Sequence, residues 1–364
     1  ALLTLLHPRL EIVVVDDGSS DETVSRLIQQ FELEAVDSLY EQRIPTEPVR
    51  AVYRSSRYPN LVVASKDKGG KADALNLGLD LAQSELVCAV DADTILDPDG
   101  LRRLVRPFLR SDEVMAAGAT IRVANGCTVQ SGRMAEERSP RHLLAGIQVI
   151  EYLRAFLFGR PGWNRLGGNL LISGAFGLFR RDRLRDIGGY AATVGEDMEL
   201  VIRLRRDGYE RDLPAKVEFI PDPVAWTEAP VAISSLSRQR ERWHRGFSEC
   251  LWRHRGVFAN PRYGVMGTVV FPAFVIFEWV APIVEVAGLV LFVLGLVLGV
   301  LNQTYAILFL TLSLGLGLLL SLLALLMEEL SFRRYGTVRD RAMLVMYALV
   351  EMIGYRQLTL YWRL

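Results

Sequence analysis

Residues 87–97 read VCAVDADTILD, an apolar strand that ends on two carboxylates, Asp91 and Asp93. Charged groups at the end of an apolar strand lose hydration, which costs free energy unless another group compensates them. A divalent metal or a basic side chain would do so. A simple turn would also explain the pair, because Asp favours turns. Asp-x-Asp alone leaves all three explanations open, so the other residues near that strand end must decide.

A second apolar strand, residues 10–15, ends in the same way on Asp16 and Asp17. Strands and helices alternate along this part of the chain, with predicted strands at 10–15, 61–64, 86–90 and 115–123 and predicted helices at 22–31, 72–82, 101–109 and 198–206. The alternation predicts an α/β domain with a mainly parallel sheet. Such sheets bind ligands at the carboxyl ends of their strands, so we expect the aspartates on one rim. Gly208 is predicted to stop the last helix, and residues 34–60, rich in charge and proline, are predicted to form a loop.

Two further motifs carry charged residues at predicted helix starts. In KDKGGKADALN, Lys71 opens a helix after two glycines, which is a suitable place for an anion. The motif is neither a P-loop nor a dinucleotide-binding fingerprint. In VGEDMEL, Glu196 and Asp197 begin a helix, where the helix dipole alone would explain acidic residues.

A third motif, SRQRERWHRGF, places Gln239, Arg242 and Trp243 in a helical stretch. Taken alone it would be an amphipathic helix that lies on anionic lipid. The formal net charge of zero gives no indication of nucleic-acid binding. The three cysteines are far apart, so the sequence predicts neither a disulfide framework nor a zinc site.

The last third of the chain is apolar. Residues 286–301 and 305–327 contain no charge, and a membrane-spanning helix needs about 20 such residues. Arginines flank this region on both outer sides, which predicts that both flanks are cytoplasmic. Residues 265–285 and 342–362 are apolar but contain internal charges, so we expect interfacial helices or broken spans there. The sequence therefore predicts a multi-pass protein of the cell membrane whose large α/β domain is cytoplasmic.

The order of the motifs VDDGSSD, GGKADALN, VDADT, SGAFGLFRR, GED and QRERW, followed by membrane helices, resembles the membrane-bound family 2 glycosyltransferases. Cellulose, hyaluronan, chitin and bacterial poly-N-acetylglucosamine synthases belong to that family. The resemblance covers residues 10–246 by motif, and QxxRW points to the chain-extending branch. One departure is that GED stands where the family has Thr-Glu-Asp.

The resemblance implies a GT-A fold and a division into three parts. These are a catalytic domain over residues 1–228, interface helices with QRERW over 229–262, and a membrane region over 263–364. It also implies a first strand that would precede residue 10 and that this sequence does not contain.

The resemblance further implies that the motif residues surround one nucleotide-sugar and its acceptor. Asp16 and Asp17 would contact uridine, with Lys71 and Asp91 near the nucleotide-sugar. Asp93, with Asp91, would hold Mg²⁺ or Mn²⁺ on the diphosphate. Asp197 would be the general base. The residues expected to border the acceptor and diphosphate are Glu196, Gln239, Arg242 and Trp243.

These roles predict an inverting, metal-dependent transferase that moves a sugar from a UDP-sugar to a growing β-linked polysaccharide at the cytoplasmic membrane face. Its expected partners are the UDP-sugar, a glycan or lipid-linked acceptor, the bilayer and secretion subunits, but no nucleic acid. Single addition to a membrane lipid is the alternative reaction. A non-catalytic membrane scaffold or regulatory subunit is the non-enzyme alternative, and the complete set of carboxylates argues against it.

Overall fold

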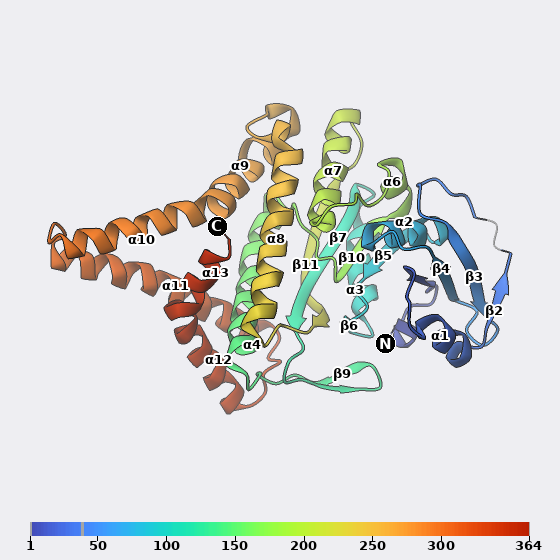
Figure 1. Ribbon diagram of the computed structural model, residues 1–364, viewed down its shortest axis with the longest axis horizontal. Helices are drawn as coiled ribbons and strands as arrows, with labels where there is room; N and C mark the ends of the chain where they lie inside the picture. Colours follow the sequence, from blue (N-terminus) through green and yellow to red (C-terminus); the bar gives the residue numbers. More distant parts are fainter. Residues whose placement is uncertain (1, 38–39, 364) are drawn as a thin grey trace. The chain divides into compact units, whose positions relative to one another are not determined.

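The computed structural model describes residues 2–37 and 40–363 (Figure 1). The chain forms two compact units, and each unit is built from two separate stretches of sequence. The first comprises Ala1–Ala119 and Asn169–Ala225, and the second comprises Thr120–Gly168 and Trp226–Leu364. The predicted division into a catalytic domain, interface helices and a membrane region stays a prediction.

A four-stranded sheet occupies the N-terminal half of the first unit. Its strand order is β1 (Ile12–Asp16), β4 (Leu61–Lys66), β3 (Val49–Ser55), β2 (Leu33–Val36). Only β1 and β4 are parallel; β3 is antiparallel to both β4 and β2. The predicted loop over residues 34–60 was therefore wrong, since it contains most of β2 and all of β3. Arg50 and Arg54 lie in β3 but alternate with better-buried residues, so the segment is a half-buried antiparallel strand.

A five-stranded sheet follows, in the order β5 (Leu86–Val90), β10 (Phe176–Arg180), β7 (Val114–Val123), β11 (Lys216–Thr227), β6 (Ile95–Leu96). β10 is antiparallel to both β5 and β7. The sheets are thus mixed, and the predicted mainly parallel sheet was wrong. The strand–helix alternation could not show this, because β10 pairs with strands more than 50 residues earlier in the chain.

The helices of the first unit pack on these sheets. They are α1 (Thr23–Phe31), α2 (Lys71–Leu81), α3 (Gly100–Arg110), α6 (Arg181–Asp186) and α7 (Glu196–Arg211), with a short 3₁₀ turn η1 (Leu2–Thr4) before β1. Leu77 of α2 packs with Val62 and Ala64 of β4. Leu200 and Leu204 of α7 belong to the core of the second sheet. These contacts fix the first residues of α2 and α7 at the ends of the strands.

Helix α7 does not stop at Gly208 as predicted; it continues to Arg211. A Cβ atom at Gly208 would lie 2.2 Å from Cβ of Ala215 and 3.0 Å from the carbonyl oxygen of Leu213. Gly208 is therefore a point of close packing inside the helix. The helix ends at Arg211 and is capped by Asp212, whose φ of 54° is left-handed.

The second unit is mainly helical. Its elements before the apolar region are the hairpin β8 (Thr128–Gln130) and β9 (Arg133–Glu136), helix α4 (Leu143–Leu153) with its π-helical extension η2 (Arg154–Gly159), α5 (Arg160–Arg165), α8 (Ile233–Arg253) and the turns η3 (Arg255–Val257) and η4 (Pro261–Tyr263). Ile150 of α4 shares a core with Tyr347 and Ala324, which come much later in the chain. In the same unit, buried Arg122 forms ion pairs with Glu137 and Glu328.

Two helical runs are long and apolar enough to cross a membrane, Met266–Val297 and Gln303–Ser331. The first consists of η5 (Met266–Val270), α9 (Phe271–Phe274), η6 (Val275–Val280) and α10 (Ala281–Val297), of which η5 and η6 are π-helical. The second is α11 (Gln303–Ser331), and α10 and α11 lie side by side as a hairpin (Figure 1). Residues 265–285, expected to be interfacial or broken, thus mostly belong to the first long helical run.

The C-terminal segment is an interrupted helix. It consists of α12 (Val338–Val350), the π-helical η7 (Glu351–Tyr355) and α13 (Arg356–Tyr361). The backbone leaves the helical conformation at Ile353 and Gly354.

Candidate active site

Three chain segments of the first unit converge around the ammonium group of Lys71. Lys71 is the first residue of α2, Asp91 follows β5, and Glu196 is the first residue of α7. The Lys71 Nζ atom lies 2.8 Å from Oδ1 of Asp91 and 2.9 Å from Oε1 of Glu196. Burial lowers the pKa of Lys71, but the two carboxylates outweigh burial and raise it, so the group stays cationic. A basic side chain therefore compensates Asp91 at the strand end.

Asp197, the predicted base, is the next residue of α7. Its Oδ1 accepts a hydrogen bond from the backbone N–H of Met198 (2.8 Å), and its Oδ2 accepts one from Gly174 N–H (3.3 Å). Burial raises the pKa of Asp197, and the negative charge of Glu196 raises it further. The two backbone hydrogen bonds and Lys71 oppose this, and the net pKa is above the ordinary value. The carboxylate can therefore bind a proton more readily than an exposed aspartate.

Gly174 allows Lys71 and Asp197 to approach each other. A Cβ atom at Gly174 would lie 3.3 Å from Lys71 Nζ and 3.8 Å from Asp197 Oδ2. A small cavity of about 10 Å³ adjoins these groups and is lined by Lys71, Gly174, Tyr190, Glu196 and Asp197 with several apolar side chains. Gly174 belongs to the motif SGAFGLFRR, but the sequence alone does not indicate this role.

Asn76 is a second residue that sequence reasoning missed. Its side-chain amide donates to the carbonyl oxygen of Tyr190 (2.9 Å), and its carbonyl oxygen accepts from Tyr190 N–H (2.7 Å). These bonds attach α2 to the loop that precedes Glu196 and Asp197. The available signal was a polar Asn among the apolar residues of a predicted helix. Asn76 thus helps to hold Lys71 and the GED motif in register.

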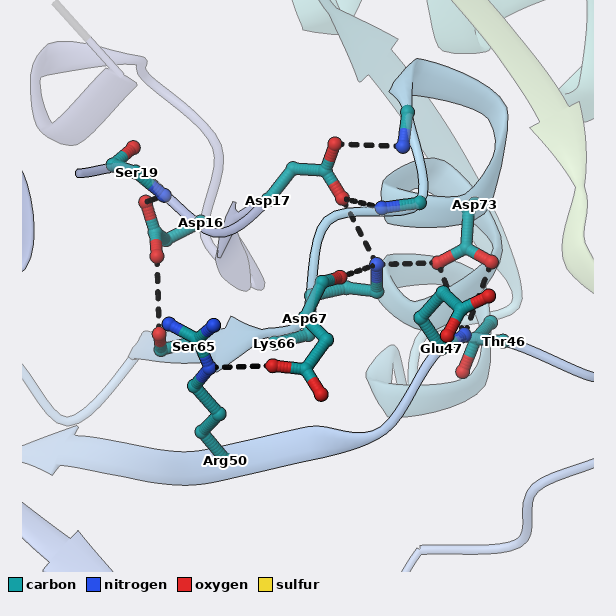
Figure 2. Close-up of polar contacts among 12 residues, drawn as sticks. Asp16, Asp17, Ser19, Thr46, Glu47, Arg50, Ser65, Lys66, Asp67 and Asp73 are labelled. Carbon is teal, nitrogen blue, oxygen red and sulfur yellow. Dashed lines mark hydrogen bonds and ion pairs between the residues drawn. The ribbon is translucent and has the colours of Figure 1, made fainter.

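Asp16 and Asp17 at the end of β1 both accept hydrogen bonds from their own chain (Figure 2). Asp16 is only 5% exposed, and its two oxygens accept from Ser19 N–H (3.2 Å) and the Ser65 hydroxyl (3.0 Å). Asp17 accepts from the N–H groups of the glycine pair before Lys71. Asp16 is therefore oriented inward, whereas Asp17 lies at the loop that begins α2.

The carboxylates fit a divalent metal only in part. Asp93 is exposed, and Asp91 is already paired with Lys71. Within residues 2–37 and 40–363, no group of three or more His, Cys, Asp or Glu side chains is arranged to hold a metal ion. Mg²⁺ and Mn²⁺ nevertheless suit sites with one or two carboxylates, because phosphate oxygens and water complete the coordination. Asp91 and Asp93 fit a metal that arrives with a diphosphate.

Gln239, Arg242 and Trp243 lie on α8 in the second unit. Arg242 is exposed, and Trp243 is 43% exposed. The guanidinium of Arg240 lies over the Trp243 ring, 4.7 Å from its centroid. Cation and ring attract at this distance, and the contact covers one ring face.

Arg240 is itself held by Glu151, in a contact that the sequence did not reveal. Its two terminal nitrogens each lie 2.7 Å from an oxygen of Glu151 on α4. The Tyr355 hydroxyl donates to the same carboxylate (2.9 Å). A bidentate pair of this kind fixes the guanidinium plane and with it the orientation of the Trp243 ring.

The family model described as Glycosyl transferase family group 2 matches residues 86–326, about two thirds of the chain. The chain belongs to this glycosyl transferase family. The predicted family resemblance is therefore confirmed.

Named relatives of this glycosyl transferase are polymer synthases. Poly-β-1,6-N-acetyl-D-glucosamine synthase of Staphylococcus epidermidis is 27% identical over 254 residues, 70% of this chain and 51% of that protein. The synthase of Staphylococcus aureus (strain COL) is 26% identical over 287 residues, 78% of this chain and 57% of that protein. The chain thus spans about half the length of the curated relatives it matches.

A solved structure shares the fold of this glycosyl transferase. A mannosyltransferase from Pyrobaculum calidifontis, determined in complex with GDP-Man and Mn²⁺, matches with a TM-score of 0.55 and 17% identity. The match covers 97% of this chain and 81% of that one. The predicted GT-A-type fold is confirmed, with mixed sheets and two long apolar helices in the C-terminal part of the chain.

Proposed function

We propose that this protein transfers N-acetylglucosamine from a UDP-sugar to a growing β-linked polysaccharide, with inversion at the anomeric carbon. The observation that carries the proposal is the group formed by Lys71, Asp91, Glu196 and Asp197 at the strand ends. Membership of a glycosyl transferase family supports the reaction class. The names of the staphylococcal relatives support the choice of sugar and polymer.

The proposed reaction is a direct displacement. Asp197 takes the proton of the acceptor hydroxyl while that oxygen bonds to the anomeric carbon, and the bond from this carbon to the diphosphate oxygen breaks. UDP leaves with the bonding electron pair. Lys71 offers positive charge near the leaving group. Asp91 and Asp93 are the residues that would hold Mg²⁺ or Mn²⁺, which supplies charge stabilisation to the diphosphate.

On the donor side, we assign the nucleoside contact to Asp17, while Asp16 shapes the strand end from its buried position. On the second unit, we assign Trp243 to stacking on a sugar of the acceptor, because its ring is exposed and oriented by Arg240. Gln239 and Arg242 are assigned to the acceptor and diphosphate as the family motif implies.

We further propose that the α10–α11 hairpin crosses the cell membrane with the catalytic residues on the cytoplasmic side. The length and apolar composition of the two helical runs support a membrane location. The arginines outside the apolar region support the orientation. Secretion subunits are a further proposed partner, which a polymer exported from this face would require.

The test uses the full-length protein in lipid nanodiscs with a panel of labelled UDP-sugars and Mg²⁺ or Mn²⁺. We expect a ladder of products from UDP-N-acetylglucosamine, dependent on metal, and no product from D197N. A single-addition product on a lipid acceptor would replace the polymerase proposal by lipid glycosylation. No UDP release from any donor would contradict the enzyme and revive the scaffold.

A further inference from the structure

Lys66, the last residue of β4, is a fully buried lysine with 0% of its surface exposed. Its ammonium has three acceptors: Oδ1 of Asp17 at 2.9 Å, Oδ1 of Asp73 at 2.5 Å and the carbonyl oxygen of Asp67 at 2.5 Å (Figure 2). An ammonium has three N–H donors, so all of them are used. A charge buried this deeply is retained only when it is paired and hydrogen-bonded, as here.

The three acceptors of Lys66 belong to different parts of the first unit. Asp17 follows β1, Asp67 continues from β4, and Asp73 lies in the first turn of α2. Asp73 also accepts from the N–H of Glu47 (3.1 Å), just before β3. Lys66 therefore connects the ends of β1 and β4 with the start of the helix that carries Lys71.

Asp17 has most of its acceptor capacity occupied. Its Oδ1 accepts from Lys66 and from Gly69 N–H (2.9 Å), and its Oδ2 accepts from Gly70 N–H (2.7 Å). Each carboxylate oxygen has about two acceptor positions, so among the described residues one position remains, on Oδ2. The Asp17 side chain is 25% exposed, so this position is within reach of a ligand.

The same contacts place a carboxylate of the chain itself, that of Asp17, at the start of α2. Backbone N–H groups at a helix start attract anions, and here the carboxylate of Asp17 accepts two of them. Burial raises the pKa of Asp17, but the bonds from Gly69, Lys66 and Gly70 outweigh it and lower the pKa. Burial lowers the pKa of Lys66, while Asp73 and Asp17 raise it. Both partners stay charged, so the orientation is constant near neutral pH.

We propose that Lys66 is a positioning residue for donor binding, which holds Asp17 so that its remaining acceptor position on Oδ2 receives an N–H of the nucleobase. The inference rests on the proposed use of a UDP-sugar. The imide N–H of uracil is a single donor that matches a single acceptor position. Lys66 has no surface to offer a ligand, so its effect on binding acts through Asp17.

The test measures the dissociation constants of UDP and CDP by calorimetry on the full-length protein in nanodiscs. K66M removes the charge at nearly the same side-chain length. K68M is the matched control, because Lys68 is an exposed lysine two residues away and its loss changes the net charge equally. D17N and the double variant K66M/D17N show whether the two residues act together.

We expect K66M to weaken UDP binding by about 10-fold to 100-fold, the range of a charge-assisted hydrogen bond, and to reduce the preference for UDP over CDP. K68M should stay within about twofold, because Lys68 is exposed and the loss of an exposed charge has little effect. D17N should add little in the K66M background, because the orientation of Asp17 is already lost.

K66Q keeps a donor for Asp17 without a charge, and it provides the measurement if K66M does not fold. We expect K66Q to weaken UDP binding less than K66M but more than K68M. A folded K66M or K66Q that binds UDP and discriminates CDP like the unmodified protein would overturn the inference alone. Failure of the unmodified protein to bind UDP would instead overturn the proposed donor.

Discussion

Asp197 differs from its neighbours in the kind of partner it has. Asp91 and Glu196 each bind the Lys71 ammonium directly, whereas among the described residues Asp197 receives hydrogen bonds only from backbone N–H groups. A carboxylate without a direct cation, beside another carboxylate and partly buried, keeps a raised pKa. Lys71 thus compensates Asp91 and Glu196 directly, and Asp197 is the carboxylate that we propose for proton transfer.

The raised pKa of Asp197 predicts how kcat changes on the acid side of its pH profile. Asp197 acts as a base only when deprotonated, so a raised pKa means that kcat falls with decreasing pH earlier than an ordinary aspartate would allow. E196Q removes the like charge that raises this pKa and should move the acid limb to lower pH. The measurement is kcat against pH, whatever the absolute rate. E113Q, at an exposed glutamate, is the control, and an unchanged limb in E196Q would contradict the assignment of Asp197.

The exposed ring of Trp243 carries a second prediction. R240K keeps the positive charge but loses the planar, bidentate contact with Glu151, so the Trp243 ring loses its fixed orientation. We expect KM for the glycan acceptor to rise by about 10-fold, the worth of one such contact, while KM for the UDP-sugar is unchanged. R238K, at an exposed arginine of the same helix, should change neither. An equal rise in both KM values for R240K would mean general damage.

The sequence predicted the charged residues of the site better than the residues that position them. Asp91, Lys71, Glu196 and Asp17 could be found because acidic and basic side chains follow apolar strands or begin helices. The positioning roles of Asn76 and Arg240 could not, because their partners lie 114 and 89 residues away, at Tyr190 and Glu151. A polar Asn in an apolar helix marks Asn76 as unusual, but the local pattern does not identify its partner.

At the scale of elements, helix α7 shows how a residue type can be interpreted wrongly. Glycine commonly ends helices, which predicted a stop at Gly208. The structure uses the missing side chain for packing against residues 213–215. Strand direction was missed for a related reason, since the antiparallel pairing of β10 depends on contacts between distant segments. The positions of the helices and strands could mostly be predicted from the local sequence, whereas the pairing of the strands could not.

Substitution by alanine should have opposite effects on thermal stability at a closely packed glycine, Gly208, and at a glycine with open space around it, Gly162. In G208A, the gain in helix propensity is about 1 kcal/mol, but a Cβ 2.2 Å from Ala215 costs about 1–3 kcal/mol. We expect a lower apparent melting temperature. In G162A on α5, no atom lies within 4 Å of the added Cβ, so the propensity gain is unopposed and the melting temperature should not fall. Equal behaviour of the two variants would contradict the packing role of Gly208.

At the scale of the whole molecule, the apolar region was predicted by its composition, but its helices are longer than the charge-free runs. Glu278 and Glu285 interrupt the apolar sequence without interrupting the helix. They form ion pairs with Arg363 (3.1 Å) and Arg356 (3.5 Å) of the C-terminal segment. In a membrane, a charged side chain with an oppositely charged partner costs less free energy than a lone one. A count of consecutive uncharged residues therefore underestimates the length of the helix.

Membrane insertion can be tested on the α10–α11 hairpin. Leu316 lies near the middle of α11 and is 57% exposed. L316R would place a charge at the proposed bilayer centre, at a cost of about 2.5–3.5 kcal/mol on insertion scales. We expect less protein in the membrane fraction after alkaline extraction. L109R, at an 80% exposed leucine of α3, should extract like the unmodified protein, and equal extraction of both variants would contradict a spanning α11.

The division into units also sets an order of events on the ribosome. The last stretch of the first unit ends at residue 225, and α11 ends 106 residues later, at residue 331 (331 − 225 = 106). At about 5–20 residues per second, that interval is about 5–20 seconds. The first unit can therefore begin to fold before the apolar hairpin has been made.

Helix α4 has the opposite timing. It is synthesised early, yet Ile150 shares a core with Ala324 and Tyr347, which are made much later. Until they arrive, part of its apolar face lacks its native cover, and exposed apolar surface of this kind makes a partly folded chain prone to aggregation. The order of the sequence thus lets the first unit start folding early, whereas the core around α4 is completed only once α11 and α12 have been made.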